Sequence, residues 1–277
     1  MLVIASAFVL SLGIGVGLML SLAIHDQEAL SRRIIMDIAV RSQQLSLLAQ
    51  DAVAGDAGAF PKLKATSNAI ETDIRALQDG TLGHLEIRGV TGAAELRQHL
   101  GATWSYMSAN TEVILRNRES LLRFVGAADR LTNELDSMKS AVDEMARAMS
   151  IDNEPTSQLI LLMREISIAD SIGRDVALMR EGNAHENELD AMGRESALFS
   201  RVLKGFKDGD ASLGIHRLIG ANASTALESA LRLNQQFQEE HTVSMIQHAF
   251  RQFEQSRDAS KQIADESVQL LATAQKL

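Results

Sequence analysis

Two clusters of polar side chains are the residues of this chain whose chemistry best suits recognition. One lies near residue 41 and the other near residue 170, at the corresponding place of an internal repeat. Their members are Arg41, Ser42, Gln43 and Gln44 in the first, and Asp170 and Arg174 in the second. Guanidinium and carboxylate groups form charge-assisted hydrogen bonds, and side-chain amides both donate and accept. On one interpretation, Arg41 with Gln43, or Asp170 with Arg174, forms a polar notch that binds a ligand or partner. On the other, these side chains face water.

No motif for catalysis accompanies these clusters. The chain lacks the phosphate loop GxxxxGK[ST], the nucleophile elbow GxSxG and the zinc motif HExxH. It has no cysteine, which excludes thiolate nucleophiles, thiolate metal sites and disulfides. His241 and His248 lie seven residues apart, but a metal there would need further ligands, and two solvated histidines are the simpler interpretation. We expect no enzymatic activity, no cofactor and no metal site.

Charge and composition narrow the class of protein further. The net charge is -9 and the isoelectric point is near 5.3, which argues against a nucleic-acid partner, because such a protein needs a basic surface. Aromatic residues make up 4% of the chain, and there are only two prolines in 277 residues. Few aromatics disfavour a β core and few prolines permit long helices, so we predict an all-α fold.

The N-terminal segment, residues 1–24, predicts a membrane-spanning helix. No ionisable side chain occurs from Leu2 to Ile24, and a helix of that length reaches about 34 Å, enough to cross a hydrocarbon core of about 30 Å. A cleaved signal peptide is the alternative, but the sequence before His25 is a poor cleavage site. Gly13 and Gly17 have the spacing of a packing face between two membrane helices.

Apolar residues recur at helical spacing along the rest of the chain. Steps of 4, 3, 4, 3 and 4 separate Leu131, Leu135, Met138, Val142, Met145 and Met149. Such a narrow stripe is typical of a helix that buries one face in a bundle. Breaks rich in glycine, asparagine or proline separate the segments. The predicted helices cover residues 2–54, 59–79, 93–118, 120–150, 156–181, 185–208, 222–239 and 242–277.

An internal repeat divides these helices into two sets. The helix that begins near Leu63, with Ile70, Ile74 and Leu77, realigns on a later helix that contains Met192, Phe199, Leu203 and Phe206. A turn precedes each copy, Gly55-Asp56 in one and Gly182-Asn183 in the other. Residues 1–24 are therefore predicted to form a transmembrane helix, and residues 25–150 and 151–277 to form two tandem antiparallel four-helix-bundle modules.

Three stretches of sequence carry a resemblance to a known family. They are Ser42-Gln43-Gln44-Leu45; residues 52–56 (AVAGD) with Ala59-Phe60; and residues 193–205 (GRESALFSRVLKG). From about His25 to its end, the chain resembles the sensory region of the PilJ family of type IV pilus methyl-accepting chemotaxis proteins. Related nitrate-sensing kinases hold an anion with an arginine where this chain has Ala39, beside Arg41, so the resemblance gives no support for anion sensing there.

The resemblance implies a function and a location. It implies the ligand-sensing periplasmic region of a dimeric chemoreceptor in the bacterial inner membrane, which controls twitching motility by helix movement across the membrane. A pilus subunit is then a candidate partner for the polar notch. A coupling protein and a histidine kinase would bind only through a cytoplasmic part that this sequence does not include.

Two other functions stay open at this point. A scaffold, a helical rod in the cell envelope, would show the same periodicity, and so would the sensor portion of a histidine kinase. The spacing of Ile263, Leu270 and Leu277 continues to the last residue, which favours a helix that extends into a following segment.

Overall fold

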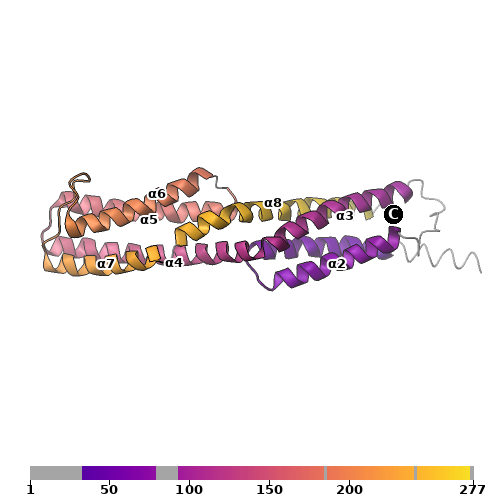
Figure 1. Cartoon of the computed structure of the whole chain (residues 1–277), viewed down its shortest axis with the longest axis horizontal. Helices are drawn as coiled ribbons and strands as arrows, with labels where there is room; N and C mark the ends of the chain where they lie inside the picture. The colour runs from indigo at the N-terminus through magenta and orange to yellow at the C-terminus, as the bar shows by residue number, and fades with distance from the viewer. Residues whose placement is uncertain (1–32, 79–92, 184–185, 240–241, 275–277) are drawn as a thin grey trace, which may run out of the picture. The chain divides into compact units, whose positions relative to one another are not determined.

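The computed structural model describes residues 33–78, 93–183, 186–239 and 242–274, and this part of the chain is all-α (Figure 1). A helix over residues 33–53 comes first. It is followed by α2 (Ala59–Gln78), α3 (Ala93–Arg116), α4 (Arg118–Ile151), α5 (Thr156–Glu181), α6 (Glu186–Asp208), α7 (Ala221–Glu239) and α8 (Thr242–Ala274). Within the described residues, pairing of the β type is limited to a single bridge between Asp210 and Ile215. The predicted all-α fold is confirmed, and α2 to α8 lie close to their predicted ranges. Of the predicted helix 2–54, the described part covers residues 33–53.

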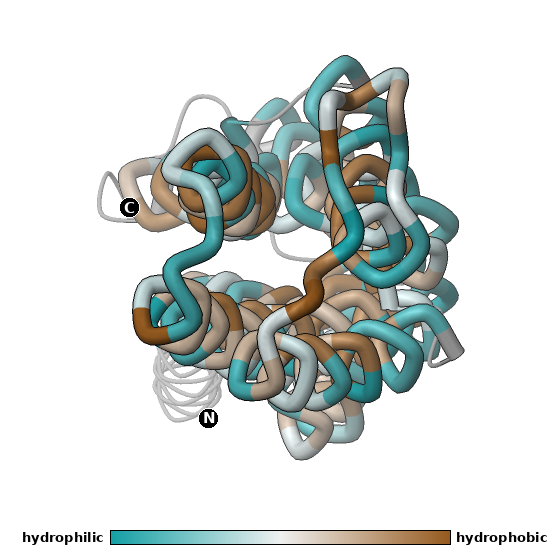
Figure 2. The backbone as a smooth tube through the Cα atoms, turned by 90° about the vertical axis from the view of Figure 1, so that its left-hand side faces the viewer, coloured by the Kyte–Doolittle hydropathy of each residue, from teal (hydrophilic) through white to brown (hydrophobic). Residues whose placement is uncertain are grey.

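The predicted apolar stripes are the core. All six stripe residues of α4, from Leu131 to Met149, are buried. Hydrophobic and hydrophilic residues share the turns of each helix, as Figure 2 shows. Because the apolar residues recur every three or four positions, burying one side of each helix leaves the charged side in water.

The described residues form two compact units. Unit 1 comprises residues up to Arg118 together with those from Ser256 onward, and unit 2 comprises Glu119–Gln255. In unit 1, hydrogen bonds join helix 33–53 to α2, α2 to α3, α3 to α8, and α8 back to helix 33–53. The partners are Arg41 and Asp73 (2.9 Å), Trp104 and Glu71, Asn110 and Gln262 (3.0 Å), and Gln43 and Ser267 (3.2 Å). Unit 1 is thus a ring of four helical segments.

Unit 2 is built from four full helices and the start of α8 (Figure 1). Side-chain hydrogen bonds join α4 to α5, α5 to α6, and α6 to α7. The partners are Lys139 and Asp170 (3.3 Å), Ser171 and Glu195 (3.2 Å), and Ser200 and Asn234 (2.9 Å). From α8, Gln247 donates to the Leu189 carbonyl oxygen of α6 at 2.9 Å.

The repeat is visible in the backbone. Gly55 and Gly182 both have positive φ, 98° and 74°, a conformation that glycine adopts without steric cost. In each turn the glycine N–H bonds three residues back and the next N–H bonds five residues back. Both helices therefore end in the same Schellman cap. The shift that brings one cap onto the other also aligns buried positions: Ile35 and Leu162, Ile38 and Glu165, Ser42 and Ala169, Leu45 and Ile172.

The compact units follow a different division from the predicted modules 25–150 and 151–277. Unit 1 takes three helical segments of the first copy and completes them with the end of α8, which belongs to the second copy. Unit 2 takes three helices of the second copy together with α4, which belongs to the first. Almost all of α4, and α8 from Ser256 onward, thus pack with helices of the other copy. Sequence order alone does not predict this exchange, and the module boundaries stay a prediction based on the repeat.

No helix within the described residues has the length and apolar character that a membrane crossing requires. The predicted span over residues 1–24, with Gly13 and Gly17, lies outside the described residues.

Candidate functional site

The residues of the first predicted cluster lie on one helix, and two of them contact two different neighbouring helices. Arg41 forms an ion pair with Asp73 of α2 at 2.9 Å, and its side chain is 40% exposed. Gln43 donates to Ser267 of α8 at 3.2 Å. Ser42 is fully buried and donates to the Ala39 carbonyl oxygen of its own helix at 2.7 Å, while Gln44 is exposed. Arg41 and Gln43 thus hold two different helices to helix 33–53.

The second predicted cluster lies on the outside of α5. Asp170 is exposed and pairs with Lys139 of α4 at 3.3 Å rather than with Arg174. The hydrogen bond that Lys139 donates to Asp136, and then the one that it donates to Asp170, raise the pKa of Lys139. Arg174 is exposed. Burial raises the pKa of the neighbouring Asp175, and the positive charge of Arg174 opposes this shift. The recognition role proposed for these residues stays a prediction.

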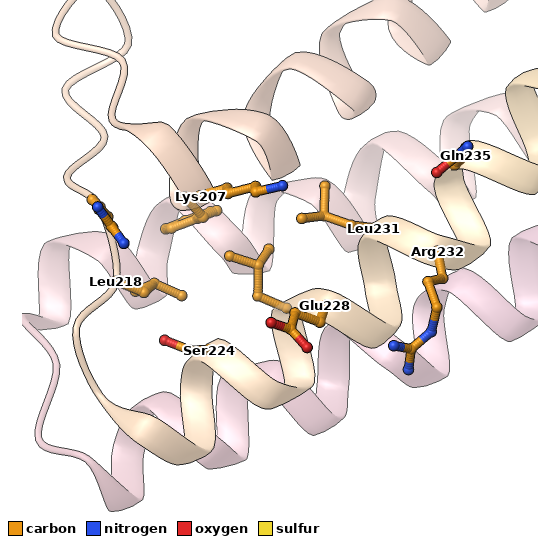
Figure 3. A pocket seen from close by; sticks show the side chains of 10 residues that line it. Lys207, Leu218, Ser224, Glu228, Leu231, Arg232 and Gln235 are labelled. Atoms are coloured by element: carbon orange, nitrogen blue, oxygen red, sulfur yellow. The ribbon is translucent and has the colours of Figure 1, made fainter.

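A pocket of about 390 Å³ lies in unit 2 between the end of α6, the 209–220 loop and α7 (Figure 3). Its residues are Phe206, Lys207, Arg217, Leu218, Ser224, Leu227, Glu228, Leu231, Arg232 and Gln235. The volume is in the range of small-molecule sites, which combine an apolar lining with a few polar groups. This pocket is the candidate site.

The loop beside the pocket is built around Asp210. One of its carboxylate oxygens accepts hydrogen bonds from the Ser212 hydroxyl (2.6 Å) and N–H (3.0 Å) and from the Leu213 N–H (3.3 Å). The other accepts from Arg201 at 2.8 Å. The Ser212 hydrogen bond and then the Arg201 hydrogen bond lower the pKa of Asp210 to about 2. Asp210 and Ile215 also exchange two backbone hydrogen bonds, both 2.9 Å, so the loop is a compact closed turn.

Three side chains from outside the loop fix its position. Gln158 of α5, which is 2% exposed, donates to the Gly214 carbonyl oxygen and accepts from the His216 N–H, both at 3.0 Å. Glu154 accepts from the N–H groups of residues 219 and 220, and Asp152 accepts from the Ala223 N–H at 2.8 Å in the first turn of α7. The Leu218 N–H bonds to the Phe206 carbonyl oxygen at 2.9 Å, at the pocket wall itself. Hydrogen bonds within the protein therefore hold the backbone at the pocket wall in place.

The pocket carries more positive than negative charge. Its lining contains Lys207, Arg217 and Arg232, against one carboxylate, Glu228. Among the residues that the structure describes, none of the three cations forms an ion pair; Arg232 donates to Ser229 at 2.9 Å. Phe206, Leu218 and Leu227 are buried beneath these groups. The arrangement suits an anion with an apolar body.

One ionisable side chain of unit 2 lies in the core. Glu165 of α5 is 2% exposed, and its Oε2 has no hydrogen-bond partner among the described residues. Burial raises the pKa of this carboxyl to about 8, against a small lowering by Arg164. The side chain is therefore largely protonated at neutral pH in the folded chain.

His241, His248 and Trp104 lie in different surroundings. His241 lies outside the described residues, and His248 is exposed and contacts the Ser244 carbonyl oxygen at 2.7 Å. Within the described residues, no group of three metal-ligating side chains is present. Trp104 is 4% exposed, so it is a core residue, and its indole N–H donates to Glu71. That hydrogen bond is the main cause of the lowered pKa of Glu71.

Sequence reasoning missed the pocket for a physical reason. The break from Gly209 to Asn222 is visible in the sequence. The cations of the pocket, however, are spaced irregularly along the chain, at 207, 217 and 232. They line one pocket because the loop folds back on α6, which depends on Asp210 and on Gln158 from a distant helix. A polar Gln158 on the apolar face of α5 was the available signal.

Comparisons with known proteins find relatives with chemotaxis names. No protein-family model matches the chain. The chain is 25% identical over 252 residues to the putative methyl-accepting chemotaxis AlkN of Alcanivorax borkumensis, which covers 91% of this chain and 36% of that protein. It is 24% identical over 210 residues to the protein PilJ of Pseudomonas aeruginosa, which covers 76% of this chain and 30% of that protein. The chain spans about a third of the length of these curated relatives. The similarity supports a PilJ-like chemotaxis protein region.

Proposed function

We propose that this chain is the ligand-sensing, periplasmic region of a membrane chemoreceptor that controls type IV pilus twitching motility. The observation that carries the proposal is the similarity to AlkN and PilJ over 91% and 76% of the chain. The pocket between α6, the 209–220 loop and α7 supports a sensing role, because hydrogen bonds within the protein hold its wall in place.

Packed helices provide a route for the signal. A bundle core resists continuous deformation, so a ligand that favours one packing moves a helix as a unit, by about 1–2 Å. The helix α8 contributes residues 242–255 to unit 2 and residues 256–274 to unit 1. In this proposal a ligand in unit 2 acts on α7 and, through α8, on helices of unit 1. The ligand must bind the two packings unequally.

The receptor is proposed to be a homodimer. Ile38 and Leu45 of helix 33–53 are both 0% exposed, so they belong to the chain's own core. The same helix exposes three other apolar residues, Met36 (44%), Val40 (62%) and Leu47 (62%), which are better placed to meet a second copy. Contact with a coupling protein, a histidine kinase or a pilus subunit remains part of the proposal for the whole receptor.

A chimaeric receptor tests the proposed function. Residues 25–277 would replace the matching region of PilJ in Pseudomonas aeruginosa lacking its own PilJ, and twitching would be measured as the expansion of the colony edge. We expect twitching to be restored at least in part. The control is the same chimaera with Phe124→Ala, a substitution that should destabilise unit 2. A stable chimaera in the membrane that never restores twitching would count against the receptor and for the scaffold.

A further inference from the structure

We propose that the pocket between α6, the 209–220 loop and α7 binds a small organic carboxylate with a short hydrocarbon body. The inference rests on the proposed sensory function for its biological meaning. The binding itself is a property of unit 2 and can be measured without any signalling partner.

The charge of the pocket is opposite to that of the chain. The protein carries a net charge of -9, yet this pocket has three cations and one carboxylate in its lining. A concave surface with low-dielectric walls concentrates the field of such charges and raises the local concentration of anions. In Figure 3 the Lys207 side chain extends toward Leu231, and the Glu228 carboxylate lies on the other side of the pocket. An anionic group can therefore approach Lys207 with Glu228 at a distance across the pocket.

The pocket also has an apolar base. Phe206 is 0% exposed, and Leu218 and Leu227 are each 4% exposed. Leu218 and Leu231 point into the same space in Figure 3. An inorganic anion would leave the partly exposed Leu231 in contact with water, whereas the hydrocarbon part of a carboxylate would cover it and remove apolar area from water. The combination favours an organic carboxylate over phosphate or sulfate.

The loop that supplies Arg217 and Leu218 is preorganised. Asp210 closes the loop, and Gln158 and Glu154 hold it to α5 and to the turn before α5. A ligand therefore meets a wall that is already ordered and avoids the entropic cost of ordering it.

The three cations come from three different segments of unit 2. Lys207 belongs to the end of α6, Arg217 to the loop and Arg232 to α7. A carboxylate bound by Lys207 of α6 would place its hydrocarbon part against α7 at Leu227 and Leu231. Occupation of the pocket would thus couple the ligand to the packing of α7 on α6.

Calorimetric titration of the full chain in detergent with butyrate tests the inference. Butyramide has nearly the same shape without charge, and butylammonium has the opposite charge. We expect butyrate to bind, butyramide to bind at least about tenfold more weakly and butylammonium not to bind. Binding of butyrate should weaken as sodium chloride is raised, because these cations are exposed to solvent.

Matched variants locate the binding. Lys207→Gln with Arg217→Gln should weaken butyrate binding by about tenfold or more. The control removes the same charge from positions outside the pocket, Arg194→Gln with Lys204→Gln, and should bind butyrate like the parent chain. None of the four residues is buried, so circular dichroism should show an unchanged helix content.

Two outcomes overturn the inference. One is no heat of binding for butyrate at millimolar concentration; the other is equal affinity of the pocket variant and the control. Failure of the PilJ chimaera to signal, with butyrate still bound, would refute the proposed function and leave the pocket assignment intact.

Discussion

Phe124 of α4 stacks on Phe253 of α8, with ring centroids 4.2 Å apart and planes inclined by 23°. The two residues are also counterparts in the repeat, since the shift that brings Leu63 onto Met192 brings Phe124 onto Phe253. Phe250 lies 6.1 Å from Phe124 and completes the aromatic cluster. The fourth helices of the two copies thus meet within unit 2 at equivalent residues. This contact accompanies the exchange by which each copy's fourth helix packs with the other copy's helices.

Phe124→Ala should destabilise unit 2 by about 3–5 kcal/mol, because the ring is 0% exposed and its removal leaves a cavity. Urea unfolding followed by circular dichroism measures the change. A double-mutant cycle with Phe253→Ala should give a coupling of about 0.5–1.5 kcal/mol. Tyr106→Ala, whose parent side chain is 67% exposed, is the control and should change stability by less than about 0.5 kcal/mol. Additive effects of the two phenylalanine variants would contradict the stacking contact.

Glu165 occupies the core position that Ile38 occupies in the first copy of the repeat, and both are nearly inaccessible to solvent. The folded chain holds a proton on this carboxyl up to about pH 8, whereas the unfolded chain releases it near pH 4.5. The free energy of unfolding therefore falls as the pH rises from about 4.5 to about 8. Glu165→Ile should remove this part of the pH dependence and stabilise unit 2 by about 2–4 kcal/mol at pH 8.

The reciprocal variant is the control for Glu165→Ile. Ile38→Glu places the same carboxyl at the equivalent core position of unit 1 and should introduce a new loss of stability with rising pH. Thermal unfolding between about pH 5 and pH 8.5 gives both curves, and the fluorescence of Trp104 reports on unit 1. An unchanged pH slope in Glu165→Ile would show that the carboxyl does not titrate in the folded chain.

The sequence predicted the helices better than it predicted the tertiary arrangement. The period of the apolar residues and the turns at Gly55 and Gly182 are local features, and the structure follows both. The partners of Arg41, Gln43 and Asp170 depend on which helices become neighbours, and no local rule supplies that. The exchange of fourth helices also depends on long-range contacts. The apolar stripes of α4 and α8 predict which face of each helix is buried but not which helices lie against it.

Asp210→Ala should loosen the 209–220 loop while leaving the helices in place. Hydrogen exchange at the amides of Ser212, Leu213 and Ile215 should become faster, because the carboxylate that accepts from this turn is gone. Asp208→Ala, an exposed neighbour at the end of α6, is the matched control. In the parent chain the lowered pKa of Asp210 means that protection persists above about pH 4 and is lost as the pH falls toward 2. Equal exchange in the two variants would refute the role given to Asp210.

Val40→Glu with Leu47→Glu should convert a dimer into a monomer in sedimentation of the full chain in detergent. Both side chains are 62% exposed in the single chain, so the substitutions should leave its core intact. Val268→Glu changes a residue of α8 that is also 62% exposed and is the control. A dimer that survives Val40→Glu with Leu47→Glu would place the interface elsewhere, and a parent chain that is monomeric at micromolar concentration would contradict the proposed homodimer.

Arg41 and Asp73 allow the polar-notch hypothesis to be tested against a purely structural role. Their ion pair is partly exposed, 40% and 25%, so breaking it from either side should cost no more than about 1 kcal/mol. If pairing is the whole function of Arg41, then Arg41→Ala and Asp73→Ala in the full-length receptor must have the same effect on twitching. We expect this result, with twitching retained in both and in Arg174→Ala, because the Arg41 guanidinium already has a partner and the Arg174 side chain lies on the outer face of α5. If Arg41 instead contacts a ligand or a pilus subunit, Arg41→Ala alone loses twitching at an unchanged protein level, since Asp73→Ala frees the guanidinium without removing it.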